Sequence, residues 1–409
     1  MKKVLLKGYY DFTNFGDDLL LIAIVDFLNQ AFPSEQKELY YEKQHDSLVL
    51  LDENRFGLEP FEEPIKHFVK RLKEKNLSKW LIAVLTFLSF GVMYVNCLIY
   101  RTTSLKLLCP KTIDYFKNLD VIHYIGGGYF TDIWHFSFQY IIYELLLLHY
   151  AKLINPNLKI VATGIGVGPV KTSFYPILLK QFFSLFNNVV VREVKSYQTL
   201  LKAGITHAKF ITDDVVLLKP RLQKAVLNLE GSDEKVLGFN LKNDKDHDYN
   251  EIATEVVKLL EAAKEEGYAV RFLCFGIDQN VLSCLNERNP HLDIEVVNPY
   301  EQDFQTFLEK FVTTSVSFGF AYHYAIVSCL FEKSTTCVYA NDYYQQKVGG
   351  VLSQLSPEQS VLHLNDFLKL DFETLKQTAA KQISHEETDK QYQMLLDEYT
   401  SIYKHFGFQ

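Results

Sequence analysis

The sequence is short of the residues that build metal centres and disulfide frameworks. Only 6 of its 409 residues are cysteines, and none of them forms a Cys-x-x-Cys pair or a cysteine–histidine spacing that matches a zinc site. We therefore expect no metal ion, and a reducing, cytoplasmic setting rather than a disulfide framework. Three cysteines stand in apolar runs and should act as small buried side chains: Cys274, Cys329 and Cys337.

An excess of basic residues is also missing. The chain has 42 Lys and Arg against 50 Asp and Glu, which gives a formal net charge of −8. Because a protein that binds duplex nucleic acid needs a basic face to displace counterions, nucleic acid is not expected as a partner. The first apolar stretch has only three residues before Lys7, so we expect a β-strand there and no signal peptide.

What is present is the composition of a folded globular protein. Hydrophobic residues make up 48% and charged residues 22% of the chain. At roughly 100–200 residues per domain, this length indicates two domains.

Apolar strands alternate with helices along the chain, and several strands end in glycine-rich turns. This pattern indicates parallel, doubly wound sheets. It stops at a polar stretch and restarts with a strand at 236–241. We therefore predict an α/β protein with two doubly wound Rossmann-like domains in a GT-B-like arrangement and a C-terminal helix. The expected divisions are an N-terminal domain (1–220) with a hydrophobic insertion near 66–111, a linker (221–235), and a C-terminal domain (236–409) that includes the final helix.

One segment does not fit the strand–helix alternation. Residues Trp80–Tyr100 carry no charge and are numerous enough to cross a bilayer, and basic residues flank them on both sides. A single crossing would place the strands at 4–8 and 120–125 on opposite sides of the membrane, although they should share one sheet. The segment is therefore expected either to be a helix buried within or between protomers, or to lie in the inner leaflet, attracted by anionic lipid.

The glycine-rich turns are the first candidates for ligand binding. They follow two expected strands at their carboxyl ends, which is where open α/β folds bind ligands. Because glycine has no side chain, the N–H groups of these turns can approach a phosphate or a sugar closely. The alternative is that they are tight turns with no ligand; neither has the full dinucleotide fingerprint. The candidate substrate-binding glycines are Gly126, Gly127, Gly128, Gly164 and Gly166.

Charged and polar residues at other strand ends are further candidates. Arg192 ends a strand and is expected to clamp an anion, and Lys242 has the corresponding place in the second half. His323 begins a helix and is either a core or cap residue or an acid–base group. After the first strand, Asn14, Gly16 and Asp17 form either a helix cap or part of the site.

The motifs, taken in their order along the chain, resemble those of the polysaccharide pyruvyl transferase family. The resemblance extends over roughly residues 4–352. It is carried by Asn14-Phe15-Gly16-Asp17, Asp120-Val121-Ile122 with Gly126–Gly128, Gly164-Ile165-Gly166-Val167-Gly168-Pro169, Val191-Arg192-Glu193 with Ser196, Leu200 and Gly204, Asp213, His323, and Lys347-Val348-Gly349-Gly350.

The resemblance implies a ketal pyruvyltransferase that needs no cofactor. Such enzymes move the enolpyruvyl group of phosphoenolpyruvate onto two hydroxyls of a sugar in a capsule, exopolysaccharide or cell-wall glycan, and release phosphate. Catalytic roles are then expected for His323 and Asp17, donor binding for Arg192 and His323, and substrate binding for Lys347. A lipid-linked oligosaccharide at the inner leaflet would suit the apolar segment, and would make the protein peripheral on the inner face of the cytoplasmic membrane.

The sequence departs from the family pattern at one position. Ala321 stands two residues before His323, where the family has arginine. Lys242, Lys347 or Arg192 would have to compensate for the missing guanidinium. The alternatives are a GT-B glycosyltransferase that uses a nucleotide sugar, or a non-catalytic glycan-biosynthesis protein of the same fold.

Overall fold

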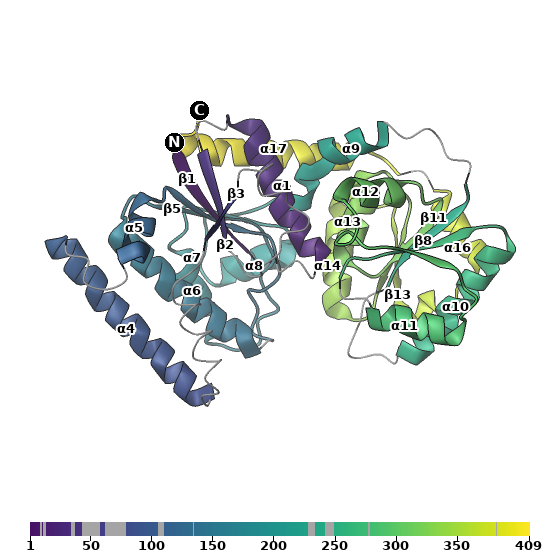
Figure 1. The fold of residues 1–409 in the computed structure, drawn as a ribbon, viewed down its shortest axis with the longest axis horizontal. Helices are drawn as coiled ribbons and strands as arrows, with labels where there is room; N and C mark the ends of the chain where they lie inside the picture. Colours follow the sequence, from purple (N-terminus) through teal and green to yellow (C-terminus); the bar gives the residue numbers. More distant parts are fainter. Residues whose placement is uncertain are drawn as a thin grey trace.

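The structure, a computed structural model, consists of two parallel β-sheets that lie side by side, each covered by helices on both faces (Figure 1). This confirms the predicted doubly wound α/β class. The structure describes residues 1–8, 10, 14–33, 37–42, 58–61, 79–104, 110–133, 135–227, 234–241, 249–276, 279–381 and 383–409.

The N-terminal sheet has seven strands in the described residues. They are β1 (Lys2–Lys7), β2 (Lys37–Glu42), β3 (Leu58–Phe61), β4 (Val121–Ile125), β5 (Lys159–Ile165), β6 (Asn188–Val191) and β7 (Ala208–Phe210). Their order is β3-β2-β1-β4-β5-β6-β7, with all neighbours parallel. The central strands β4 and β5 are buried and mostly apolar because helices cover both faces. These helices are α1 (Phe15–Ala31), α4 (Lys79–Thr103), α5 (Pro110–Asn118), α6 (His135–Ile154), α7 (Tyr175–Phe183) and α8 (Val194–Lys202), followed by the 3-10 helix η2 (Asp214–Leu218) and α9 (Lys219–Leu227).

The C-terminal sheet has six described strands, again all parallel. They are β8 (Val236–Asn240), β9 (Ala269–Leu273), β10 (Ile294–Val297), β11 (Val316–Gly319), β12 (Thr336–Tyr339) and β13 (Ser360–His363), in the order β10-β9-β8-β11-β12-β13. The helices of this half are α10 (Tyr249–Glu265), α11 (Gln279–Arg288), α12 (Phe304–Val312), α13 (Tyr322–Leu330), α14 (Asp342–Leu355), α15 (Leu364–Phe367), α16 (Phe372–Ala379) and α17 (Glu386–His405).

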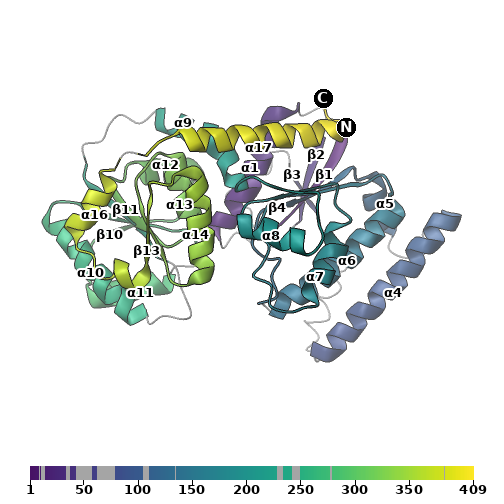
Figure 2. The ribbon, with the colours of Figure 1, turned by 180° about the vertical axis from the view of Figure 1, so that it is seen from behind.

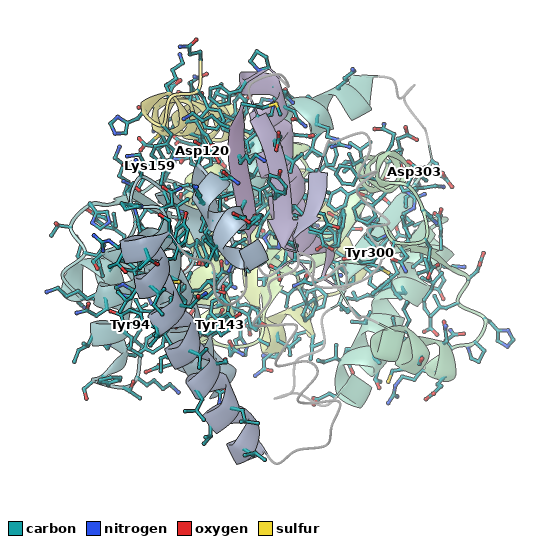
Figure 3. The ribbon with its side chains drawn as sticks, turned by 60° about the vertical axis from the view of Figure 1, so that its left-hand side comes forward. Tyr94, Asp120, Tyr143, Lys159, Tyr300 and Asp303 are labelled. Atoms are coloured by element: carbon teal, nitrogen blue, oxygen red, sulfur yellow. The ribbon has the colours of Figure 1, made fainter. Side chains whose placement is uncertain are left out.

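Helix α1 joins the two halves. Its first residue, Phe15, is fully buried and packs edge-on against Phe275, Phe304 and Phe307 of the C-terminal half, with ring centroids 5.4, 5.8 and 4.7 Å away. One turn later, Asp18 accepts a hydrogen bond from the hydroxyl of Tyr300, which is labelled in Figure 3. Because this joint is apolar and buried, it opposes movement of one half against the other.

Helix α17, at the end of the chain, crosses back to the N-terminal sheet (Figures 1 and 2). Tyr399 and Tyr403 are buried there and pack against Phe27 of α1, with ring centroids 5.8 and 6.1 Å away. The predicted C-terminal helix therefore covers the first half of the chain, and its last turn lies beside the N-terminus (Figure 1).

A buried polar network fixes α17 in this place. His123 of β4 contacts the Tyr403 hydroxyl through Nδ1 at 2.7 Å and Thr163 Oγ1 through Nε2 at 2.6 Å. Thr163 in turn donates to Asp214 Oδ2 at 2.9 Å, and Tyr399 donates to the other oxygen of Asp214. Burial lowers the pKa of His123 to about 3 and raises that of Asp214 to about 7, so both groups favour their neutral forms.

Helix α4 coincides with the long apolar segment and lies at the outer edge of the N-terminal half (Figure 1). Its inner face contacts α6, where Cys97 is buried and the ring of Tyr94 lies 6.3 Å from that of Tyr150. Its outer face exposes Leu88, Val92 and Val95, which follow one another at helical spacing. Within the described ranges, no helix has both the length and the apolar character needed to span a membrane.

Candidate active site

The two glycine-rich turns are bonded to each other at the carboxyl edge of the N-terminal sheet. The N–H of Gly166 donates to the carbonyl of Gly127 at 2.7 Å, and that of Gly126 donates to Thr163 at 2.9 Å. Gly126 and Gly164 have positive φ angles of 41° and 57°, which other residues adopt only with strain. The side chain of Asp214 fills the space beside Gly164, with Oδ2 2.7 Å from the position of a Cβ. Gly126, Gly164 and Gly166 thus build a fixed scaffold, and their contact with substrate stays a prediction.

Gly127 and Gly128 differ from the other glycines. Among the described atoms, none accepts a hydrogen bond from either N–H group. Gly128 also marks a point where donors from both halves meet. The position that a Cβ would take on Gly128 lies 3.1 Å from Lys347 Nζ, 3.2 Å from the Tyr343 hydroxyl and 3.5 Å from Arg192 Nη2.

Arg192 follows β6 and is held by two carboxylates, of which Asp213 is fully buried. Its Nη1 donates to Asp213 Oδ2 at 2.7 Å and its Nε to Glu193 Oε1 at 3.3 Å, while the guanidinium stacks 4.7 Å from the ring centre of Tyr322. Burial alone would lower the pKa of Arg192, but Tyr322, Asp213 and Glu193 together raise it well above its usual value. The guanidinium is therefore charged and fixed, and no described atom accepts a hydrogen bond from Nη2.

His323 lies in the first turn of α13 and connects this cluster to α1. Its Nε2 is 3.9 Å from Asp213 Oδ2, and Tyr322 donates to the same oxygen at 3.3 Å. The other side of the imidazole lies against Gly16: the position of a Cβ there would be 2.8 Å from the Cγ of His323 and nearer still to Nδ1. Gly16 is thus required so that the histidine can approach α1.

Asn14 and Asp17 stand at the start of α1, on either side of Gly16. Asn14 is the N-cap residue, but its side chain makes no capping bond; its Nδ2 donates to Asp17 Oδ2 at 2.6 Å instead. Both side chains are partly exposed, so that Asp17 can meet a ligand next to His323.

The structure thus brings together Gly16, Gly128, Arg192, His323 and Lys347, which come from both halves of the chain. Lys242 lies outside the described residues. Sequence analysis assigned no role to three residues of this cluster: Asp213, Tyr322 and Tyr343. The two tyrosines have no motif to distinguish them. Tyr343 could have been found from its spacing of four residues to Lys347, had α14 been expected as a helix.

Comparison with known proteins identifies the family. A sequence model of the family described as "Polysaccharide pyruvyl transferase" matches residues 14–343. The chain belongs to the polysaccharide pyruvyl transferase family. It is accordingly a transferase, as predicted. A relative, "Amylovoran biosynthesis protein AmsJ" of Erwinia amylovora, is 24% identical over 94% of this chain and 96% of its own length.

Solved structures share the fold of this pyruvyl transferase family member. UDP-GlcNAc 2-epimerase from Neisseria meningitidis bound to UDP-GlcNAc superimposes with a TM-score of 0.53 at 12% identity, over 97% of this chain and 100% of that one. The epimerase from Methanocaldococcus jannaschii gives 0.53 at 11% identity, over 97% and 98%. These likenesses confirm the GT-B-like architecture, and at this identity they concern the fold alone.

Proposed function

We propose that the protein is a ketal pyruvyltransferase that uses phosphoenolpyruvate as donor. It would transfer the enolpyruvyl group onto two hydroxyls of one sugar in a glycan precursor and release inorganic phosphate. The observation that carries this proposal is the meeting of Arg192 and Lys347 at Gly128, with His323 joined to the same cluster through Asp213.

The donor is a small molecule with a phosphate and a carboxylate, so its site needs fixed cations and free N–H groups. Arg192 Nη2, Lys347 Nζ and the N–H groups of Gly127 and Gly128 supply both. Because the guanidinium is already ordered by Asp213, little side-chain entropy is lost when it binds an anion.

The reaction needs groups that move protons. The methylene carbon of the donor takes up one proton, which makes C2 electrophilic, and two sugar hydroxyls each lose one when their oxygens bond to C2. Phosphate leaves when the bond between C2 and the phosphate oxygen breaks. One of the two hydroxyl protons balances the proton taken up by the methylene carbon, and the other leaves on the phosphate or passes to water. His323 and Asp17 are the proposed acid–base pair, since they flank Gly16 and lie beside the donor cluster.

The acceptor is proposed to be a precursor of a surface glycan, such as an exopolysaccharide or capsule. Support comes from the family and from the relative AmsJ, whose name assigns it to amylovoran biosynthesis.

Phosphate release from phosphoenolpyruvate, measured with and without a glycan acceptor, tests the proposal. Acceptor-dependent release should fall by roughly 10²–10⁴ in His323→Gln, the usual worth of a positioned proton transfer. His149→Gln, at an exposed histidine of α6, serves as control and should leave the rate unchanged. If wild-type protein neither binds phosphoenolpyruvate nor releases phosphate with any acceptor, the proposal is wrong. Turnover of a nucleotide sugar would then favour a glycosyltransferase, and no turnover a non-catalytic role.

We further propose that α4 attaches the protein to the inner face of the cytoplasmic membrane. Leu88, Val92 and Val95 form an exposed apolar stripe, and Leu98 is also exposed. The sequence on both sides of the helix is basic, which complements anionic lipid. Such a helix lies in the interface with its apolar face buried among the lipids.

Co-sedimentation with anionic liposomes tests this attachment. Binding should survive high salt, because buried apolar area is not screened, and should be lost in Val92→Asp/Val95→Asp. The matched control is Ile177→Asp/Val194→Asp, at two exposed apolar residues of α7 and α8. If the wild-type protein does not bind liposomes but forms dimers, and the α4 variant is monomeric, the membrane proposal is wrong. The apolar stripe would then be a contact between protomers.

A further inference from the structure

Two consecutive aspartates at the start of η2 are fully buried, and their side chains reach different parts of the molecule. Asp213 Oδ2 accepts hydrogen bonds from Arg192 at 2.7 Å and from Tyr322 at 3.3 Å. The same oxygen lies 3.9 Å from His323 Nε2. Asp214 instead contacts the second glycine-rich turn and α17. Because a peptide bond joins the two residues, whatever holds Asp214 in place also restricts Asp213.

The carboxyl group of Asp214 supports the end of β5, where the second glycine-rich turn begins. Its Oδ2 accepts a hydrogen bond from the Thr163 hydroxyl at 2.9 Å and lies 2.7 Å from the position of a Cβ on Gly164. The carbonyl oxygen of Thr163 accepts the N–H of Gly126, in the first turn, at 2.9 Å. One buried carboxyl group therefore contacts the second turn directly and reaches the first through Thr163.

Helix α17 holds this carboxyl group by its other oxygen. The hydroxyl of Tyr399, which is fully buried, donates to Asp214 Oδ1. In its first turn the same helix is bound to the C-terminal half, where Thr388 Oγ1 donates at 2.9 Å to the carbonyl of Leu355, the last residue of α14. The helix therefore extends from the end of α14 to the support of the glycine-rich turns in the other half.

Asp214 acts through its shape and its hydrogen bonds rather than through a paired charge. Within the parts of the chain that the structure describes, no Lys, Arg or His side chain forms an ion pair with it. Burial, reinforced by the charge of Asp213, raises the pKa of Asp214 to about 7. A neutral carboxyl group and a side-chain amide both offer one acceptor oxygen and a donor, so asparagine can replace this aspartate conservatively.

We propose that Tyr399 and Asp214 are positioning residues for the reaction. Tyr399 fixes the Asp214 carboxyl group, which fixes the second glycine-rich turn at Gly164 and the first through Thr163. The peptide bond to Asp213 extends the same restraint to the carboxylate that orders the active-site guanidinium. The inference rests on the proposed function for the reaction that the two residues serve, but the restraint on the turns can be measured without that reaction.

Hydrogen exchange of the full-length protein without ligands, followed by mass spectrometry, measures this restraint. Tyr399→Phe removes one hydroxyl and keeps the ring. In this variant the N–H groups of Gly126 and Gly166, which are bonded at 2.9 and 2.7 Å, should exchange roughly 10-fold faster, while β8 keeps its wild-type rates. The matched control is Tyr124→Phe, which removes another buried tyrosine hydroxyl that donates to a carboxylate, Glu144 of α6 at 2.6 Å.

The kinetic test is acceptor-dependent phosphate release, measured well below the thermal midpoint of every variant. The turnover number of Tyr399→Phe should fall by roughly 10- to 100-fold, because small displacements of reacting groups are costly. Tyr124→Phe should keep the wild-type value. Asp214→Asn should stay close to wild type, whereas Asp214→Ala, which removes both acceptor oxygens, should be slowed at least as much as Tyr399→Phe.

The outcomes separate this inference from the proposed function. If Tyr399→Phe matches an active wild type in exchange and turnover, the inference is wrong while the proposed function stands. Equal losses in Tyr399→Phe and Tyr124→Phe would mean a general loss of stability, and faster exchange with full turnover would mean that the reaction does not need the restraint; either result overturns the inference. If wild type releases no phosphate but Tyr399→Phe loosens both turns, the restraint is upheld and the proposed function is rejected.

Discussion

The imidazole of His323 lies directly against Gly16, so that one residue in each half of the chain fixes the position of the other. Gly16→Ala should therefore displace His323 without disturbing α1, since alanine is the better helix former. We expect the turnover number to fall by about 10²-fold, as is usual when a reacting group moves by about 1 Å. Because the new methyl group overlaps a buried side chain, the free energy of unfolding should also fall, by about 1–3 kcal/mol. Gly350→Ala, in open space on α14, should leave the rate intact.

Arg192 cannot be replaced by alanine without a cost in stability. Because its partner Asp213 is fully buried, removal of the guanidinium leaves an unpaired charge, which costs about 3–5 kcal/mol. Arg192→Lys keeps the charge but loses Nη2 and the stacking on Tyr322. We expect it to fold and to bind phosphoenolpyruvate roughly 10- to 150-fold more weakly.

A matched control for Arg192→Lys exists at another arginine. Arg221 also pairs with a carboxylate, Asp26 at 2.9 Å, and stacks 4.7 Å from the ring centre of Phe304. Arg221→Lys should therefore lose comparable packing and leave donor affinity unchanged. Equal effects of the two substitutions would show that Arg192 acts on stability rather than on the donor.

Ala321 allows the missing arginine to be restored. This residue is the N-cap of α13, and its N–H donates to Asn240 Oδ1 at 3.1 Å. We expect Ala321→Arg to tighten phosphoenolpyruvate binding by adding a second guanidinium near Arg192. Ala321→Gln adds similar bulk without charge and should give no gain. If Ala321→Arg binds phosphoenolpyruvate no more tightly than Ala321→Gln, position 321 does not contact the anion that Arg192 and Lys347 are proposed to bind.

The buried network under α17 should make stability depend on pH. The pKa of Asp214 is raised to about 7, so its contribution is present below its unfolded value, near 4, and is lost as the pH rises through 7. The pKa of His123 is lowered to about 3, so its contribution is present above about 6.5 and is lost as the pH falls through 3. The two dependences oppose one another between about pH 4 and 6.5.

Asp214→Asn should remove only the first of these dependences. The free energy of unfolding of the variant should therefore rise with pH between 4 and 7 more steeply than that of wild type, by up to about 1.4 kcal/mol per pH unit. Urea unfolding at a series of pH values measures this difference. Asp366→Asn, at an exposed aspartate, should run parallel to wild type. Parallel curves for Asp214→Asn would contradict a raised pKa in the folded protein.

The succession of strands, helices and glycine-rich turns could be predicted from the sequence because apolar periodicity reports local structure. The pairing of Arg192 with Asp213 could not, since the two are 21 residues apart and meet only when β6 and the segment after β7 lie next to each other. The same holds for Lys347: the family motif pointed to it, but its orientation depends on Tyr322 and Tyr343, whose packing no short motif records.

Helix α17 illustrates a second limit. The sequence predicted a C-terminal helix, but the pattern of apolar residues along a helix does not say which surface covers its apolar face. The answer depends on single contacts, such as that of Tyr403 with His123, which joins residues 280 positions apart in the sequence.

This contact of the last helix with the first sheet bears on how the chain is made. During synthesis, domains commonly fold one after another, beginning at the N-terminus. Here the N-terminal sheet lacks Tyr399 and Tyr403 until residues 386–405 have left the ribosome, so Phe27 and His123 lack these two contacts until then. The core of the first half is thus completed only after the strands of the second sheet, β8 to β13, have been translated.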